Sequence, residues 1–216
     1  MPNFLRHLAA DLRSAPWPIW LILVLCALPE LFFLAASGGI VDLPRARAMA
    51  YDSFGFWAGL LGNWQPNYVL QPYVMFLTYG FLHAGLLHFT VNMLALVSLG
   101  GPVAQAIGSR RFLVLYVLLL IAGALGFALW PDVGLPMVGA SGALFGLAGL
   151  LLAWDLRYRL RAGRALGPVM RSLAVLMGMN LVLWLAMGGH LAWQTHLGGF
   201  IAGWAAAWFV QPNPRR

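Results

Sequence analysis

Charged residues are scarce in this chain, and their scarcity excludes an ordinary soluble domain. Only 9% of the 216 residues are Asp, Glu, Lys or Arg, whereas 62% are hydrophobic, and the mean hydropathy is +0.81. Soluble domains carry about 25% charged residues. Most of this chain therefore has to be covered by something other than water, and the hydrocarbon core of a membrane is the environment that fits.

Cysteine is nearly absent, and lysine is absent altogether. The single cysteine, Cys26, has no second cysteine in the chain with which to form a disulfide bond. All 13 basic residues are arginine, and the formal net charge is +7. These arginines are scattered and do not gather into a groove, so nucleic acid is not an expected partner.

Long apolar runs, by contrast, recur along the sequence. They lie at 17–36, 76–101, 112–130, 138–154, 167–187 and 192–210. A spanning helix needs about 20 apolar residues, and backbone groups in lipid can bond only one another. We therefore expect an all-α, polytopic membrane protein built as a six-transmembrane-helix bundle over 17–210. A cytoplasmic N-terminal segment at 1–16 and a cytoplasmic tail at 211–216 would flank it.

The distribution of arginine predicts the orientation of this bundle. Six spans place both termini on one side of the membrane, and only Arg45 and Arg47 of the 13 arginines fall on the other side. Loops rich in Arg stay in the cytoplasm. We expect an integral, multi-pass protein of a bacterial inner membrane, with both termini cytoplasmic and with some affinity for anionic membrane lipid.

Four polar side chains share one depth in this arrangement. Spans two, four and six run in the same direction, so depths can be compared by counting from their cytoplasmic ends. At 1.5 Å per residue, Ser141 and His196 each lie about 21 Å from that end, and His88 lies about 20 Å from it. Asn92 follows one turn below His88 on the same helix face. A layer of this kind among apolar residues predicts a site.

Glycine patterns indicate which spans touch. Ser141 and His196 are each followed by a Gly-x-x-x-Gly motif, at 142–146 and 199–203. Small residues at four-residue spacing allow helices to approach closely in membranes. We therefore expect spans four and six to pack together, which would bring the serine and the histidine within hydrogen-bonding reach.

The chemistry that such a layer permits is acyl transfer. Serine becomes a nucleophile when a neighbouring base, here the neutral His196, accepts its proton. Donors for a tetrahedral oxyanion are available from His88, Asn92 and the Ser141 backbone N–H. The nearest acids lie in an outer loop or about 21 Å away at the far end of the helix, so a Ser–His dyad is the most that the sequence supports.

Each residue taken singly has a plainer interpretation. A serine in a membrane helix usually bonds its own helix, and His88 and Asn92 would more often hold helices together. His196 alone would fit a proton relay in a transporter. The shared depth and the glycine motifs favour acyl transfer over these alternatives.

Three motifs resemble those of a known family and occur in the right order on spans two, four and six. They are His83-Ala-Gly-Leu-Leu-His88-Phe-Thr-Val-Asn92, Gly139-Ala-Ser141-Gly142 and His196-Leu-Gly-Gly199. Over 17–210 the chain closely resembles the rhomboid intramembrane serine proteases. The resemblance implies that Ser141 is the nucleophile, that His196 is the base, and that His88, Asn92 and the Ser141 N–H form the oxyanion hole.

The same resemblance implies the partners and the supporting residues. Substrates would be single-spanning membrane proteins, cut near the outer membrane face without a metal or cofactor. Supporting residues would be His83, Gly139, Gly142, Phe145 and Gly199. His83 is expected to point about 140° away from His88. Phe145 stands where the family often has a tyrosine that packs on the catalytic histidine. No oligomeric state is predicted.

Two departures and two alternatives accompany this interpretation. The chain has Val74-Met75 where many members carry Trp-Arg, and Ala104 where an acid is common. The alternative function is non-catalytic, either a pseudoprotease that handles membrane clients or a small transporter. The loop 188–195 is expected to move aside for substrates, although a passive turn with an anchoring Trp193 explains it equally well.

Overall fold

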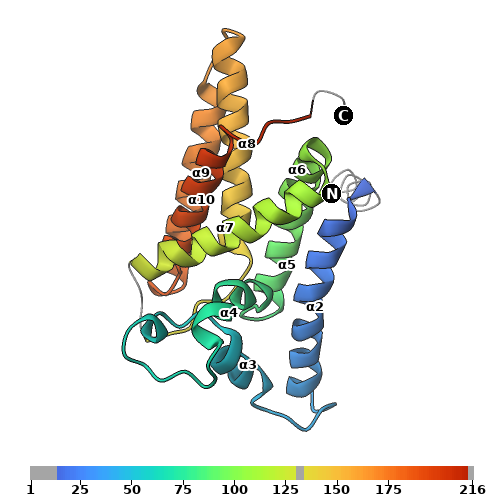
Figure 1. The fold of residues 1–216 in the computed structure, drawn as a ribbon, viewed down its shortest axis with the longest axis vertical. Coiled ribbons are helices and arrows are strands. Elements are labelled where there is room, and N and C mark those ends of the chain that lie inside the picture. Colours follow the sequence, from blue (N-terminus) through green and yellow to red (C-terminus); the bar gives the residue numbers. More distant parts are fainter. Residues whose placement is uncertain (1–13, 130–133, 214–216) are drawn as a thin grey trace.

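The apolar runs fold as helices, because backbone N–H and C=O groups in lipid have to bond one another. A computed structural model describes residues 14–129 and 134–213, over which the chain is a helical bundle (Figure 1). Its helices are α2 (Trp17–Ser37), α3 (Ala46–Phe54), η1 (Ala58–Leu61), α4 (Gln71–Thr78), η2 (Tyr79–Phe81), α5 (Leu86–Ala95), η3 (Leu96–Gly100), α6 (Gly101–Ile107), α7 (Ser109–Leu129), α8 (Ser141–Arg161), α9 (Gly167–Ala186) and α10 (Trp193–Ala206). Most of the expected N-terminal segment and the last three residues of the tail lie outside the described residues.

Within the described residues, four helical segments are long and apolar enough to cross a membrane. They are Trp17–Ser37, Leu86–Ile107, Ser109–Leu129 and Gly167–Ala186. Helix α10 has only 14 residues, about 21 Å of helix against a hydrocarbon core of about 30 Å. Helix α8 has 21 residues, but its end at 155–161 is rich in charge. The all-helical membrane bundle is confirmed, whereas the count of six spans stays a prediction.

The second apolar run is not the single helix that we expected over 76–101. The chain leaves its helical path after η2, and Gly85 adopts a φ of +114°, which no helix can hold. Helix α5 then begins, continues through the π-helical turn η3, and joins α6. The spanning segment is therefore Leu86–Ile107, and His83 lies in the loop that precedes it.

Glycine contacts hold α8 against α10, as expected from the two Gly-x-x-x-Gly motifs. A Cβ atom on Gly199 would overlap the carbonyl oxygen of Gly142, and one on Gly203 would overlap that of Gly146. The backbones of the two helices therefore touch directly, and side chains at these positions would force them apart. The predicted packing of spans four and six is confirmed.

The segment between α2 and α4 is folded and anchored to the bundle. The buried carboxylate of Glu30, in the second half of α2, pairs with Arg47 of α3 through contacts of 2.8 and 2.9 Å. Phe56 exchanges two 3.0 Å backbone hydrogen bonds with Met137, the isolated antiparallel bridge of the described residues. This bridge ties the loop to the segment that leads into Ser141.

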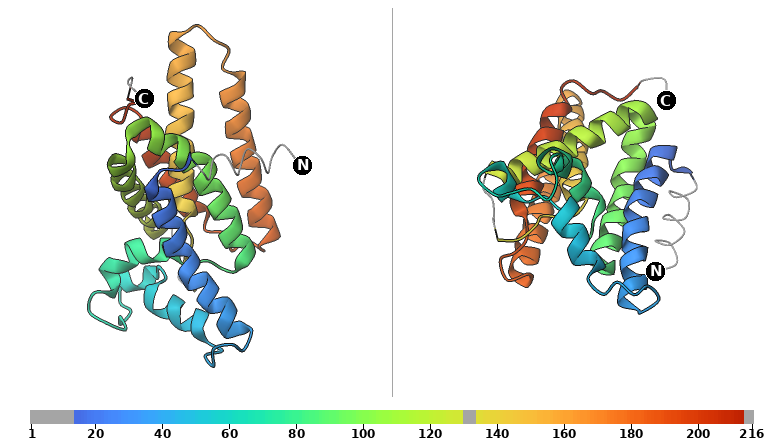
Figure 2. Two further views of the ribbon diagram at one scale, coloured as in Figure 1. Left: turned by 90° about the vertical axis from the view of Figure 1, so that its right-hand side faces the viewer. Right: turned by 60° about the horizontal axis from the view of Figure 1, so that its bottom comes forward.

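Helix α9 stands apart from the other long helices. Val169 is its one buried residue, and only 6% of its apolar window is buried. The α8–α9 hairpin extends beyond the rest of the bundle in Figure 2 (left view). Because α9 buries so little of its surface, its polar side chains have few protein neighbours.

Candidate active site

Ser141 is the first residue of α8, and the residues just before it are held in a sharply defined backbone conformation. Gly139 has a φ of +124°, and a Cβ atom there would lie 2.7 Å from Cε1 of His88. The Gly139 N–H donates to the carbonyl of Tyr79 at 2.9 Å. Only glycine fits this position, since a side chain would meet both backbone strain and the His88 ring. The Ser141 N–H lies in the first turn of α8, where amides lack intrahelical partners.

His196 faces this serine from the first turn of α10. Its Nε2 lies 2.8 Å from Oγ of Ser141, which is a hydrogen-bonding distance. The histidine is buried, and Ser141 is partly exposed. The glycine contacts between α8 and α10 begin one residue after Ser141 and three residues after His196, so the helix packing itself sets this distance.

The ring of Phe145 fixes the plane of the His196 imidazole. The two rings are stacked, with centroids 4.1 Å apart and planes 6° apart. Phe145 lies one turn beyond Ser141 on α8, so nucleophile and stacking ring belong to the same rigid element. A phenyl ring can do this without a hydroxyl, because the stacking uses the ring face.

A third side chain contacts His196, and the sequence interpretation missed it. Oδ1 of Asn180 on α9 lies 2.8 Å from His196 Nδ1. Asn180 is half-buried within an apolar helix, and a lone amide in such a helix is a signal that could have been used. It escaped the depth argument because that argument compared only the three spans that run in one direction.

The expected oxyanion donors, His88 and Asn92, differ in the hydrogen bonds that they make. Nδ1 of His88 accepts the Ala84 N–H at 3.2 Å, so the ring proton sits on Nε2, next to Gly139. The side-chain amide of Asn92 donates to the His88 carbonyl at 2.8 Å, and its buried Oδ1 has no hydrogen-bond partner among the described residues. Asn92 therefore uses one of its two N–H groups on its own helix.

His83 lies against His88 and does not point away from it. The two rings meet edge to face with centroids 5.2 Å apart, and the His83 ring also contacts Phe89. The expected 140° separation assumed one continuous helix and is wrong, because the chain bends at Gly85. His83 is buried, and its ring nitrogens have no hydrogen-bond partner within the described residues.

The carbonyl of His83 is held by two residues of α3. Arg47, already paired with Glu30, donates a hydrogen bond to it, and the Tyr51 hydroxyl donates another at 2.7 Å. Burial raises the pKa of Tyr51, so its hydroxyl stays protonated and able to donate. This pair anchors the segment before α5 in a chain that lacks the Trp-Arg motif.

The loop before α10 turns through two glycines. Gly188 and Gly189 have φ values of +60° and +90°, a conformation that favours glycine. Trp193 follows at the start of α10 and is 39% exposed. These features fit both a moving loop and a passive turn, and the movement of the loop stays a prediction.

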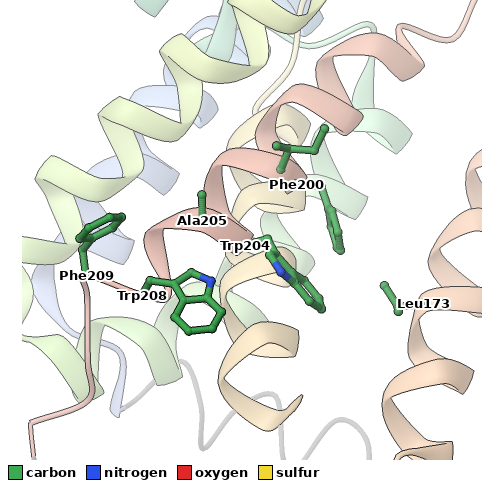
Figure 3. Close-up of a pocket in the computed structure, with 7 residues that line it drawn as sticks. Leu173, Phe200, Trp204, Ala205, Trp208 and Phe209 are labelled. Carbon is green, nitrogen blue, oxygen red and sulfur yellow. The ribbon is translucent and has the colours of Figure 1, made fainter. Parts of the chain in front are cut away.

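An apolar groove lies between α9 and the second half of α10 (Figure 3). Its volume is about 570 Å³, and its lining is Leu173, Phe200, Ile201, Trp204, Ala205, Trp208 and Phe209. Ser141 and His196 do not line it. Within residues 14–129 and 134–213, no three His, Cys, Asp or Glu side chains come together in a way that would hold a metal ion.

Comparisons with known proteins agree with the motifs. A Rhomboid domain model matches residues 71–213, which is more than half of the chain. The chain is 37% identical over 126 residues to Rhomboid protease GluP of Bacillus subtilis, which covers 58% of this chain and 24% of that protein. It is 34% identical over 135 residues to RHOMBOID-like protein 1 of Arabidopsis thaliana, covering 62% of this chain and 33% of that one.

A mitochondrial relative matches over a longer part of this chain. Rhomboid protein 1, mitochondrial, of Saccharomyces cerevisiae is 34% identical over 161 residues, covering 68% of this chain and 44% of that protein. The chain thus spans less than half the length of each of these three relatives. The domain match, the apolar helices and these relatives lead to one conclusion: this chain is an integral membrane protein and belongs to the rhomboid family.

Proposed function

We propose that this protein is an intramembrane serine endopeptidase that cleaves transmembrane segments of membrane proteins with a Ser141–His196 dyad. The observation that carries the proposal is the 2.8 Å separation between Ser141 Oγ and His196 Nε2. Membership of the rhomboid family and the printed name of the Bacillus subtilis relative support the same activity.

The first half of the reaction forms an acyl-enzyme. Nε2 of His196 accepts the hydroxyl proton while Oγ of Ser141 attacks the scissile carbonyl. The tetrahedral intermediate collapses as the C–N bond breaks, and His196 returns the proton to the leaving nitrogen. In the second half a water attacks the ester, His196 again takes the proton, and Oγ leaves as the regenerated serine hydroxyl.

We propose that hydrogen-bond donors near Ser141 stabilise the negative charge of the tetrahedral intermediate. We assign this role to the His88 Nε2–H, the Ser141 N–H and the second amide proton of Asn92. The positive end of the α8 dipole adds to their effect. Donors of this kind are individually worth about 10²–10³ in kcat where they have been removed from serine hydrolases.

Single-spanning membrane proteins are the substrates that we propose. A scissile bond has to be extended to reach both Ser141 and the oxyanion donors, so helix-weakening residues near it would favour cleavage. The orientation that we propose, with both termini cytoplasmic, rests on the distribution of arginine. We also propose a bacterial inner membrane as the location. The site would then open toward the outer face.

The loop 188–195 is our proposed cover of the site. Its positive-φ glycines and the weakly packed α9 beside it support movement. Crosslinking this loop to the start of α5 should block cleavage of transmembrane substrates and spare labelling by a small fluorophosphonate. Undiminished cleavage by the crosslinked protein would favour the passive turn.

Labelling with a serine-directed fluorophosphonate tests the proposed chemistry. The purified protein should be labelled at Ser141, and Ser141→Ala should take up no label. His196→Ala should lose most of it, because the unassisted hydroxyl is a poor nucleophile. A folded wild-type protein that takes up no label and cleaves no transmembrane substrate would favour a non-catalytic membrane protein.

A further inference from the structure

Asn180 places a polar amide in an apolar, mostly exposed helix. It lies in α9, which exposes most of its surface, and an amide in a lipid-facing helix is unfavourable unless it finds a partner. Its Oδ1 has one at 2.8 Å, the Nδ1 of His196. The partner is the nitrogen of the imidazole opposite the one that faces Ser141.

We propose that Asn180 is a positioning residue that fixes the tautomer and the orientation of the catalytic base. This inference rests on the proposed function, because it assigns a role to Asn180 in the activation of Ser141. Asn180 touches neither the serine nor the substrate in this role and acts through His196 alone.

Hydrogen-bond chemistry dictates the tautomer. The side-chain carbonyl oxygen of asparagine can only accept, so His196 Nδ1 has to carry the proton that it donates to Asn180. In a neutral imidazole the other nitrogen, Nε2, then has a free lone pair. That lone pair faces Ser141 Oγ at 2.8 Å and is ready to accept the hydroxyl proton.

The same contact serves the charged state of the base. When His196 takes the serine proton, both ring nitrogens become donors, and Asn180 Oδ1 continues to accept from Nδ1. The oriented amide dipole stabilises the imidazolium in the place that a carboxylate takes in a Ser-His-Asp triad. Phe145 fixes the ring plane, but stacking alone does not distinguish the ring from one flipped by 180° about its Cβ–Cγ bond. A directional bond at Nδ1 selects the productive orientation.

The same hydrogen bond would exist if Asn180 only attached α9 to α10. The variants therefore have to distinguish this structural role from the positioning of His196. Asn180→Leu keeps a similar branched shape and removes the acceptor. Asn180→Asp restores an acceptor at the same distance. Ser172→Leu is the matched control, because it removes another polar side chain from α9 at an exposed position away from the site.

Steady-state cleavage of a transmembrane substrate gives the first readout. Asn180→Leu should lower kcat by at least about tenfold, toward the ~10⁴-fold loss that a wrong tautomer causes in serine proteases, with KM changed far less. Asn180→Asp should recover most of kcat, and Ser172→Leu should match the wild type. Wild-type kcat in a folded Asn180→Leu protein, or an equal loss in the Leu and Asp variants, would overturn the proposal.

The second readout does not depend on turnover. The ¹⁵N resonances of the full chain in bilayers, with His196 assigned by substitution, should report the Nδ1–H tautomer in the wild type and its loss in Asn180→Leu. A wild-type His196 that carries its proton on Nε2 contradicts the proposal whether or not Asn180→Leu folds. If the wild type shows the Nδ1–H tautomer but neither labels nor cleaves, the proposed function fails and the assigned tautomer stands.

Discussion

Ser141 and His196 meet because neighbouring glycines, which have no side chains, allow the backbones of α8 and α10 to come into direct contact. Gly142 and Gly199 pack backbone against backbone, and the reactive side chains extend from the same ends of α8 and α10. This part of the site was predictable, since helix depth and glycine spacing are both written in the sequence. The Nδ1 partner of His196 was not, because Asn180 reaches it from a helix of opposite direction.

A glycine two residues before the nucleophile offers a test at the residue scale. Gly139→Ala should lower the rate of fluorophosphonate labelling by about a hundredfold, because the new methyl group would displace the His88 ring or Ser141 itself. The backbone strain at its φ of +124° should also reduce stability by about 1–3 kcal/mol.

Gly163→Ala is the matched control for that substitution. Gly163 also has a positive φ, of +60°, but no atom lies within 4 Å of the position that an added methyl group would occupy. It should show a loss of thermal stability with the labelling rate unchanged. Equal labelling rates in the Gly139 and Gly163 variants would mean that close contact with His88 is unimportant.

At the scale of elements, the helices were easier to predict than the break between them. Length and apolarity identify α2, α7 and α9 directly. The run 76–101 reads as one helix, yet the chain bends at Gly85. The bend is held by tertiary contacts: the Tyr79 hydroxyl donates to Leu120 and its carbonyl accepts from Gly139, and Arg47 and Tyr51 hold His83. Local sequence does not encode those partners.

The contact between α8 and α10 gives a prediction at this scale. Gly203→Ala places a methyl group against the Gly146 carbonyl, between one and two turns along the helices from the dyad. Overpacking there should destabilise the protein by about 1–3 kcal/mol and should slow labelling of Ser141 by separating the helices. Thermal unfolding in detergent, followed together with labelling, measures both effects.

Gly178→Ala on α9 is the corresponding control. No atom lies within 4 Å of its Cβ position, so the same change should be neutral or stabilise by about 0.4–1 kcal/mol. If Gly203→Ala were as harmless as Gly178→Ala, the direct backbone contact would not be what sets the geometry of the dyad.

At the scale of the whole molecule, composition decided the class and left the count of spans open. An apolar chain with few charges has to be a helical membrane bundle, and the structure agrees. The number of crossings depends on α8 and α10, which are too charged or too short to qualify by length and apolarity alone. A helix shorter than the hydrocarbon core can still cross the membrane where water enters the bundle, and the sequence alone does not show where water enters.

Reporter fusions test the resulting topology. Fusions after Arg164 and at the C-terminus should report the cytoplasm, and a fusion within 42–62 should report the outer side, because arginine is concentrated on one side of the predicted spans. A C-terminal reporter on the outer side would show that α8 and α10 do not both cross, and the shared-depth argument would fail with it.

Proteolysis by purified protein in lipid vesicles tests the central claim most directly. The wild type should cut a single-spanning substrate within or near its membrane segment. Ser141→Ala and His196→Ala should each reduce cleavage below a few per cent while keeping wild-type thermal stability, since both halves of the proposed reaction use this pair. Substantial cleavage by either folded variant would contradict the account.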